Sequence, residues 1–100
     1  NAMLNIVNKS PLERNALQSC IEAGTGGAIL LIEDGVYAVA RGNSFEPTLK
    51  AAMGQFKVYA LAPDLDARGI ADRIMEGVTA VDYAGFVDLV AEYKSSQSWL

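Results

Sequence analysis

The chain contains one cysteine, Cys20, in the stretch LQSCIEAG (17–24), and it contains no histidine. A thiol can act as a nucleophile or carry sulfur as a persulfide when its thiolate forms easily. The absence of histidine removes Ser-His and Cys-His nucleophile pairs, histidine acid–base catalysis and the usual zinc sites. Cys20 is therefore the one candidate catalytic residue, as a persulfide carrier.

The position of Cys20 argues against an activated thiol. At roughly 100° per residue, one half of the predicted helix is apolar, and its members are Leu12, Ala16, Leu17, Cys20 and Ile21. Cys20 falls near the middle of this half and in the last turn, where the free carbonyl groups make the local potential negative. Burial and this helix end both disfavour a thiolate, and no Lys or Arg lies one turn away. We expect an inert, buried thiol.

Pairs of carboxylates follow two of the predicted strands. Asp64 and Asp66 could form a weak metal pair, but they lack the glycine-spaced companions of a calcium loop. Asp64 follows a proline and is typical of a helix N-cap, with Arg68 available as an ion-pair partner. Glu33 and Asp34 are interpreted as solvated strand-end residues that cap the next helix. We therefore expect no metal site.

Two phosphate-binding patterns are also excluded. The glycines of GTGGA (24–28) close a helix and precede a strand, which is the reverse of the order in a dinucleotide-binding loop. A receiver-type phosphoacceptor domain needs acidic residues after its first strand, where this chain has Asn8 and Lys9. We therefore expect no bound cofactor.

The elements that must position these residues alternate along the chain. Ser10, Pro11 and Glu13 form a capping box with proline at the first helical position, which predicts a helix from there to Gly24. Strands are predicted over 4–7, 28–32, 57–61 and 78–81, and further helical segments over 36–40, 47–53, part of 64–77 and 83–94. In the last helix, one face is predicted to hold Phe86, Val87, Leu89, Val90 and Tyr93.

Strands that alternate with helices predict an α/β fold with a parallel or mostly parallel sheet between two helix layers, of flavodoxin-like type. The sheet would have four strands, or five if the tail SSQSWL (95–100) forms an edge strand rather than docking on a partner. One domain spans 3–100, because one hundred residues suit a single small core. Asn1 and Ala2 precede the first methionine and are interpreted as an expression-tag remnant.

Composition narrows the partners and the compartment. The net charge of −4, from 8 basic and 12 acidic residues, argues against direct binding of nucleic acid. No apolar run reaches the ~20 residues of a membrane helix, and no signal peptide is evident. A single cysteine cannot form an internal disulfide, which fits a cytoplasmic protein.

Nearly the whole chain, from Met3 to Leu100, resembles the DsrH/TusB family. The matching segments are MLNIVNKSP, LLIEDGVYA, KVYALAPDLDARG, VDYAGFVDLV and SQSWL. The resemblance implies a DsrE-like α/β fold and a small subunit of the DsrEFH or TusBCD sulfur-relay complexes. These are heterohexamers with DsrE/TusD-like and DsrF/TusC-like subunits, which pass a persulfide to a downstream acceptor protein. They serve dissimilatory sulfur oxidation (DsrH-like) or 2-thiolation of the tRNA wobble uridine (TusB-like).

In this family the principal sulfur-carrying cysteine belongs to the DsrE/TusD subunit. The stretch NKSPLERNALQSC resembles DsrH more than TusB and favours the sulfur-oxidation branch. The main hypothesis is an assembly subunit, with Tyr37, Phe45, Trp99 and Leu100 as candidate interface residues; Tyr37 and Phe45 could equally close the core. The alternatives are an active carrier that uses Cys20 and a stand-alone ligand-binding domain.

Overall fold

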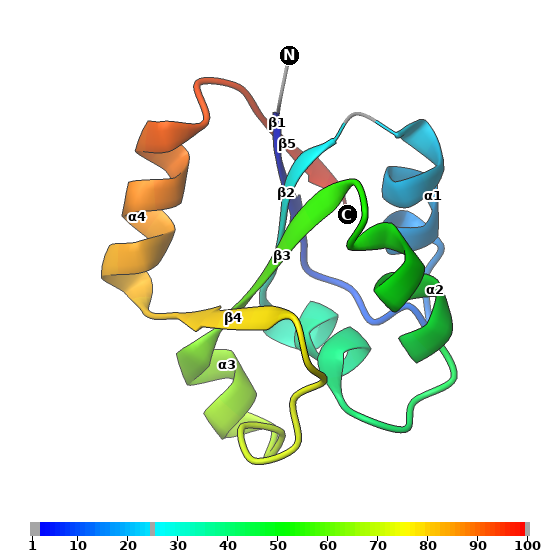
Figure 1. The fold of residues 1–100 in the computed structure, drawn as a ribbon. Helices are drawn as coiled ribbons and strands as arrows, with labels where there is room; N and C mark the ends of the chain where they lie inside the picture. Colours follow the sequence, from blue (N-terminus) through cyan, green and yellow to red (C-terminus); the bar gives the residue numbers. More distant parts are fainter. Residues whose placement is uncertain (1–2, 25, 100) are drawn as a thin grey trace.

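The computed structural model describes residues 3–24 and 26–99. Within them lies one sheet of five strands in the order β4-β3-β2-β1-β5 (Figure 1). The strands are β1 (Met3–Val7), β2 (Gly27–Leu31), β3 (Phe56–Leu61), β4 (Val78–Val81) and β5 (Ser96–Trp99). Each neighbouring pair is parallel. The predicted α/β fold with a parallel sheet is confirmed, and the tail forms the fifth, edge strand.

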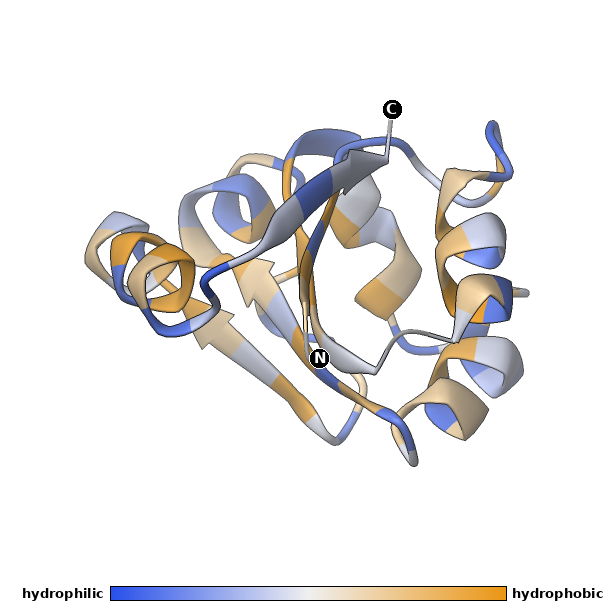
Figure 2. Ribbon diagram, turned by 90° about the horizontal axis from the view of Figure 1, so that it is seen from above, coloured by the Kyte–Doolittle hydropathy of each residue, from blue (hydrophilic) through white to orange (hydrophobic). Residues whose placement is uncertain are grey.

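The connections decide which face of the sheet each helix covers. From β1 to β4 the chain steps in one direction across the sheet, through α1 (Ala16–Ala23), the 3-10 helix η1 (Glu33–Val39), α2 (Glu46–Ala52) and α3 (Ala62–Ala67). It then returns across the sheet to β5 through α4 (Tyr83–Glu92). Because parallel crossovers are right-handed, the reversal places α4 on the opposite face. Figures 1 and 2 show α4 alone on one side, with α1 and α2 on the other.

The strand order differs from that of flavodoxin, although a fold of flavodoxin-like type was predicted. In flavodoxin the chain reverses its direction across the sheet after the second strand, whereas here it reverses after the fourth. Three successive connections therefore share one face of the sheet. The three-layer arrangement is as predicted, but the layers are unequal.

The core has two parts, one on each face of the sheet. The larger part includes Leu17, Ile29, Val58 and Leu65, and lies on the face covered by α1, η1, α2 and α3. The smaller part consists of Leu4, Ala28, Leu30 and Leu89, with partly buried neighbours. Strand β2 contributes to both, and its residues 28–31 are all fully buried. Such a continuous apolar run is expected of a central strand between helix layers.

The edge strand β5 is held beside β1 by a buried amide. Asn5 is fully buried, and its Nδ2 donates to the carbonyl oxygen of Ala28 on β2 at 3.1 Å. Its Oδ1 accepts a hydrogen bond from Nε1 of Trp99 at 3.1 Å. One side chain thus joins three neighbouring strands, and it satisfies the indole N–H that the last strand brings inward.

The predicted start of the first helix is wrong. Ser10 does begin a turn: its Oγ accepts from the Leu12 N–H, and its carbonyl oxygen accepts from the N–H groups of Glu13 and Arg14. This turn does not continue, and α1 begins only at Ala16, after Asn15. A capping pattern supplies partners for the first N–H groups, but extension of a helix depends on packing. Leu12 consequently lies on the surface and not on the buried face.

Gly27 and Gly42 have similar backbone conformations but differ in how closely other atoms pack around them. Gly27 (φ +90°) begins β2, and a Cβ there would collide with the backbone N and O of Met3. Gly42 has a similar φ of +87°, but a Cβ there would meet open space. We expect Gly42→Ala to lower the free energy of unfolding by about 1–2 kcal/mol, from backbone strain alone. Gly27→Ala should lower it by roughly 3–5 kcal/mol, because strand pairing must also shift.

Urea denaturation of both variants, followed by circular dichroism, measures these losses. Equal losses would show that β1 and β2 are not packed this closely at Met3 and Gly27.

Candidate functional site

Cys20 lies inside the protein. It is fully buried, on the face of α1 that packs against the sheet, and belongs to the larger core cluster. Burial raises the pKa of its thiol from an ordinary value of 9.0 to about 11. No basic residue lies in the last turn of α1 to oppose this effect. The burial predicted from the helical pattern is confirmed, and the structure supplies none of the features that activate a thiol.

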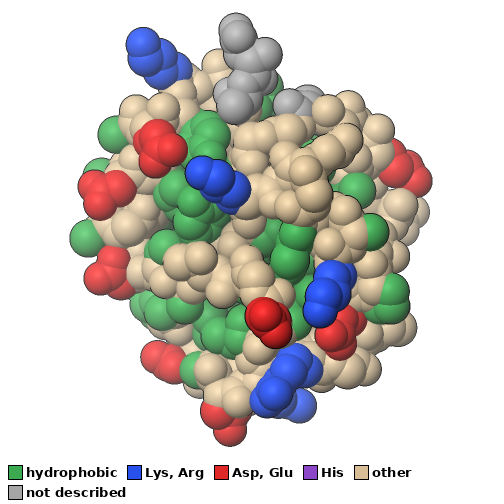
Figure 3. Space-filling view, viewed as in Figure 1, with side chains coloured by type: hydrophobic (Ala, Val, Ile, Leu, Met, Phe, Trp, Pro, Cys, Tyr) green, Lys and Arg blue, Asp and Glu red, His purple; other side chains and the backbone are tan. Residues whose placement is uncertain are grey.

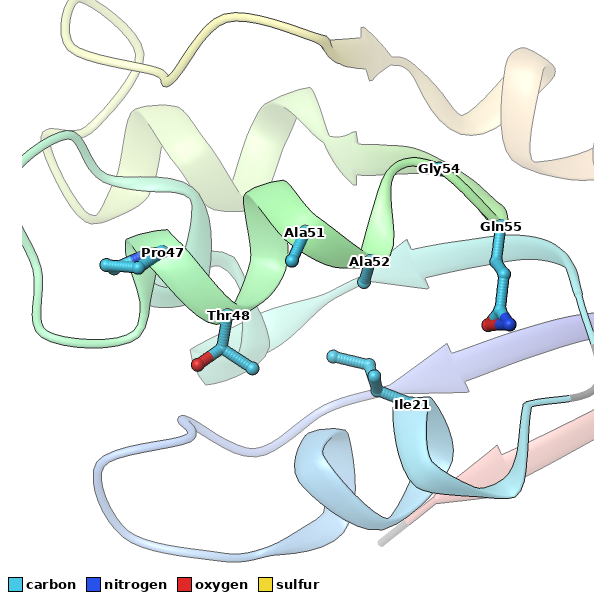
Figure 4. A pocket seen from close by; sticks show the side chains of 7 residues that line it. All are labelled: Ile21, Pro47, Thr48, Ala51, Ala52, Gly54 and Gln55. Atoms are coloured by element: carbon cyan, nitrogen blue, oxygen red, sulfur yellow. The ribbon is translucent and has the colours of Figure 1, made fainter.

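An open groove of about 650 Å³ lies between α1 and α2. Figure 4 shows the side chain of Ile21 facing those of Thr48 and Ala52 across it. The full lining is Ile21, Pro47, Thr48, Ala51, Ala52, Gly54 and Gln55. Cys20 is not part of the lining, and no lining residue is charged. The groove therefore offers surface for contact but no ionisable side chain that could act as an acid or a base.

A second cluster lies at the carboxyl ends of β2 and β3, where parallel α/β sheets commonly bind ligands. Nε of Arg68 donates to Oδ1 of Asp34 at 2.9 Å, and Nη1 of Arg68 lies 3.7 Å from Oδ1 of Asp64. Oδ2 of Asp64 accepts from the backbone N–H of Glu33 at 2.7 Å, where the chain turns sharply with a φ of +50°. These contacts join α3 to the start of η1. The charged side chains of Arg68, Asp34 and Asp64 are engaged with one another and hold α3 against η1.

The capping roles predicted for this cluster need correction. Asp64 lies within α3, whose N-cap is Leu61, and its carboxylate accepts from the first N–H group of η1 instead. Glu33 and Asp34 lie in the first turn of η1, and the N-cap Ile32 has no side-chain hydrogen bond. The expected partnership of Asp64 with Arg68 is present, but Asp34 is the closer partner. In the parts of the chain that the structure describes, no group of three or more His, Cys, Asp or Glu is placed to hold a metal ion.

The candidate interface residues differ in their exposure. Phe45 and Trp99 are partly buried and pack against the larger core. Tyr37, on η1, is exposed. Leu100 lies outside the described residues. Of the three that can be described, Tyr37 alone is exposed, at 39%.

Most of the large, exposed hydrophobic side chains among the described residues lie instead on α4. Val87 and Val90 were predicted to share the packed face, but both are exposed, as is Tyr83. Phe86 and Leu89 make the contacts with the sheet, and Val87 lies about 100° from Phe86 around the helix. The sequence did contain a signal for this exposure. The apolar face of α4 is wider than the face that a helix can bury against one sheet. Among the described residues, no helix is long and apolar enough to cross a bilayer.

The buried thiol should react slowly with alkylating reagents. A pKa near 11 lowers the thiolate fraction near pH 8 by about 100-fold relative to a thiol with a pKa of 9.0, and burial adds a steric barrier. We expect iodoacetamide to modify Cys20 of the folded chain at least 100-fold more slowly than that of the same chain in 6 M guanidinium chloride (~6 M is ample to unfold a small domain). Mass spectrometry of timed samples measures both rates. Similar rates would show that the thiol is accessible.

Comparison with known proteins identifies the family of this chain. Residues 9–96 match the family described as "DsrH like protein". The chain is 42% identical to "Protein TusB" of Salmonella dublin and of Salmonella enteritidis PT4 over 74 residues, which cover 74% of this chain and 76% of each relative.

A solved structure shares the fold at low sequence identity. It is described as a protein of unknown function, MTH1491, from Methanobacterium thermoautotrophicum. The TM-score is 0.75 at 16% identity, and the match covers 97% of this chain and 96% of that one. The structural match extends over the whole α/β domain, and the sequence match identifies the family. The chain belongs to the DsrH family, together with the TusB proteins that it resembles.

Proposed function

We propose that the chain is an assembly subunit of a cytoplasmic sulfur-relay complex. In this role it joins DsrE/TusD-like and DsrF/TusC-like subunits in a heterohexamer and helps to form the docking surface for the downstream sulfur-acceptor protein. Membership of the DsrH family supports this role. The observation that carries it is the complete burial of the only cysteine in the chain.

Sulfur transfer through persulfides requires an accessible thiolate. The thiolate attacks the outer sulfur of a donor persulfide, the bond between the two donor sulfurs breaks, and the donor leaves as a thiolate. Cys20 is neither accessible nor easily ionised, because its sulfur is inside the core and the pKa of its thiol is raised to about 11. Without histidine, the chain also lacks the usual base for activating a thiol. The relayed sulfur is therefore assigned to a cysteine of a partner subunit.

Two pathways use such complexes, and the chain has features of both. The curated relatives bear the name TusB, which supports 2-thiolation of the tRNA wobble uridine. The stretch NKSPLERNALQSC supports the DsrH branch and dissimilatory sulfur oxidation. The assembly role is the same in both. The net charge of −4 favours a protein acceptor over direct binding of tRNA.

The decisive experiment is sulfur transfer by a complex that contains Cys20→Ala. We expect the variant to assemble with the two partner subunits and to deliver sulfur to the acceptor within about twofold of the unsubstituted complex. The substitution removes one buried sulfur atom, and we expect it to lower the free energy of unfolding by about 1–2 kcal/mol. Transfer of radiolabelled sulfur and peptide mass spectrometry report on the two complexes side by side.

Loss of transfer, together with an added sulfur atom on Cys20 of the unsubstituted complex, would establish the alternative of an active carrier. Failure of the chain to bind either subunit would favour the other alternative, a stand-alone ligand-binding domain.

A further inference from the structure

We draw no further inference here: the strongest candidate, the row of exposed apolar side chains on α4 (Tyr83, Val87 and Val90), which is the helix along the left edge of the molecule in Figure 3, carries nothing because nothing in the structure shows what covers this face.

Discussion

The position of β5 beside β1 governs the rest of this structure. The chain makes three steps in one direction and must then cross the whole sheet to reach the free edge of β1. Since parallel crossovers are right-handed, this single return connection puts one helix, α4, on a face that no other helix covers. The opposite face receives α1, η1, α2 and α3 and most of the core. The inequality of the two layers is thus a consequence of topology, and it leaves α4 accessible along most of its length.

Asn5 is the local interaction that secures this arrangement. A four-residue edge strand such as β5 contributes few hydrogen bonds, and a short strand by itself is marginal. The hydrogen bonds from Nδ2 of Asn5 to β2 and from Trp99 to Oδ1 of Asn5 add two contacts, the first buried and the second partly buried. Trp99 was considered as an interface residue, but it is partly buried against the larger core. In this chain its indole serves first to hold the last strand.

The sequence predicted the strands well because their signal is local. The run of residues 28–31 is apolar on both faces, and only a strand between two helix layers buries such a run completely. Cys20 was placed correctly for a related reason, since helical periodicity is reliable within a single helix. The start of α1 was wrong because the hydrogen bonds of Ser10 close a turn without requiring a helix to follow. The exposure of Val87 was missed because periodicity shows how wide an apolar face is, but not how much of it the sheet covers.

The reactive groups of this chain and its exposed surface differ in character. A chain without histidine, whose only thiol is buried, has no group that could accept or release sulfur at its surface. What it does present is helix α4, with exposed apolar side chains and with two carboxylates, Asp88 and Glu92, that make no ion pair with the described residues. An exposed apolar surface lowers solubility if nothing covers it, and the net negative charge limits association of the chain with other copies of itself. These features are consistent with a protein that contributes shape and specificity to an assembly, while the reactive sulfur belongs to another subunit.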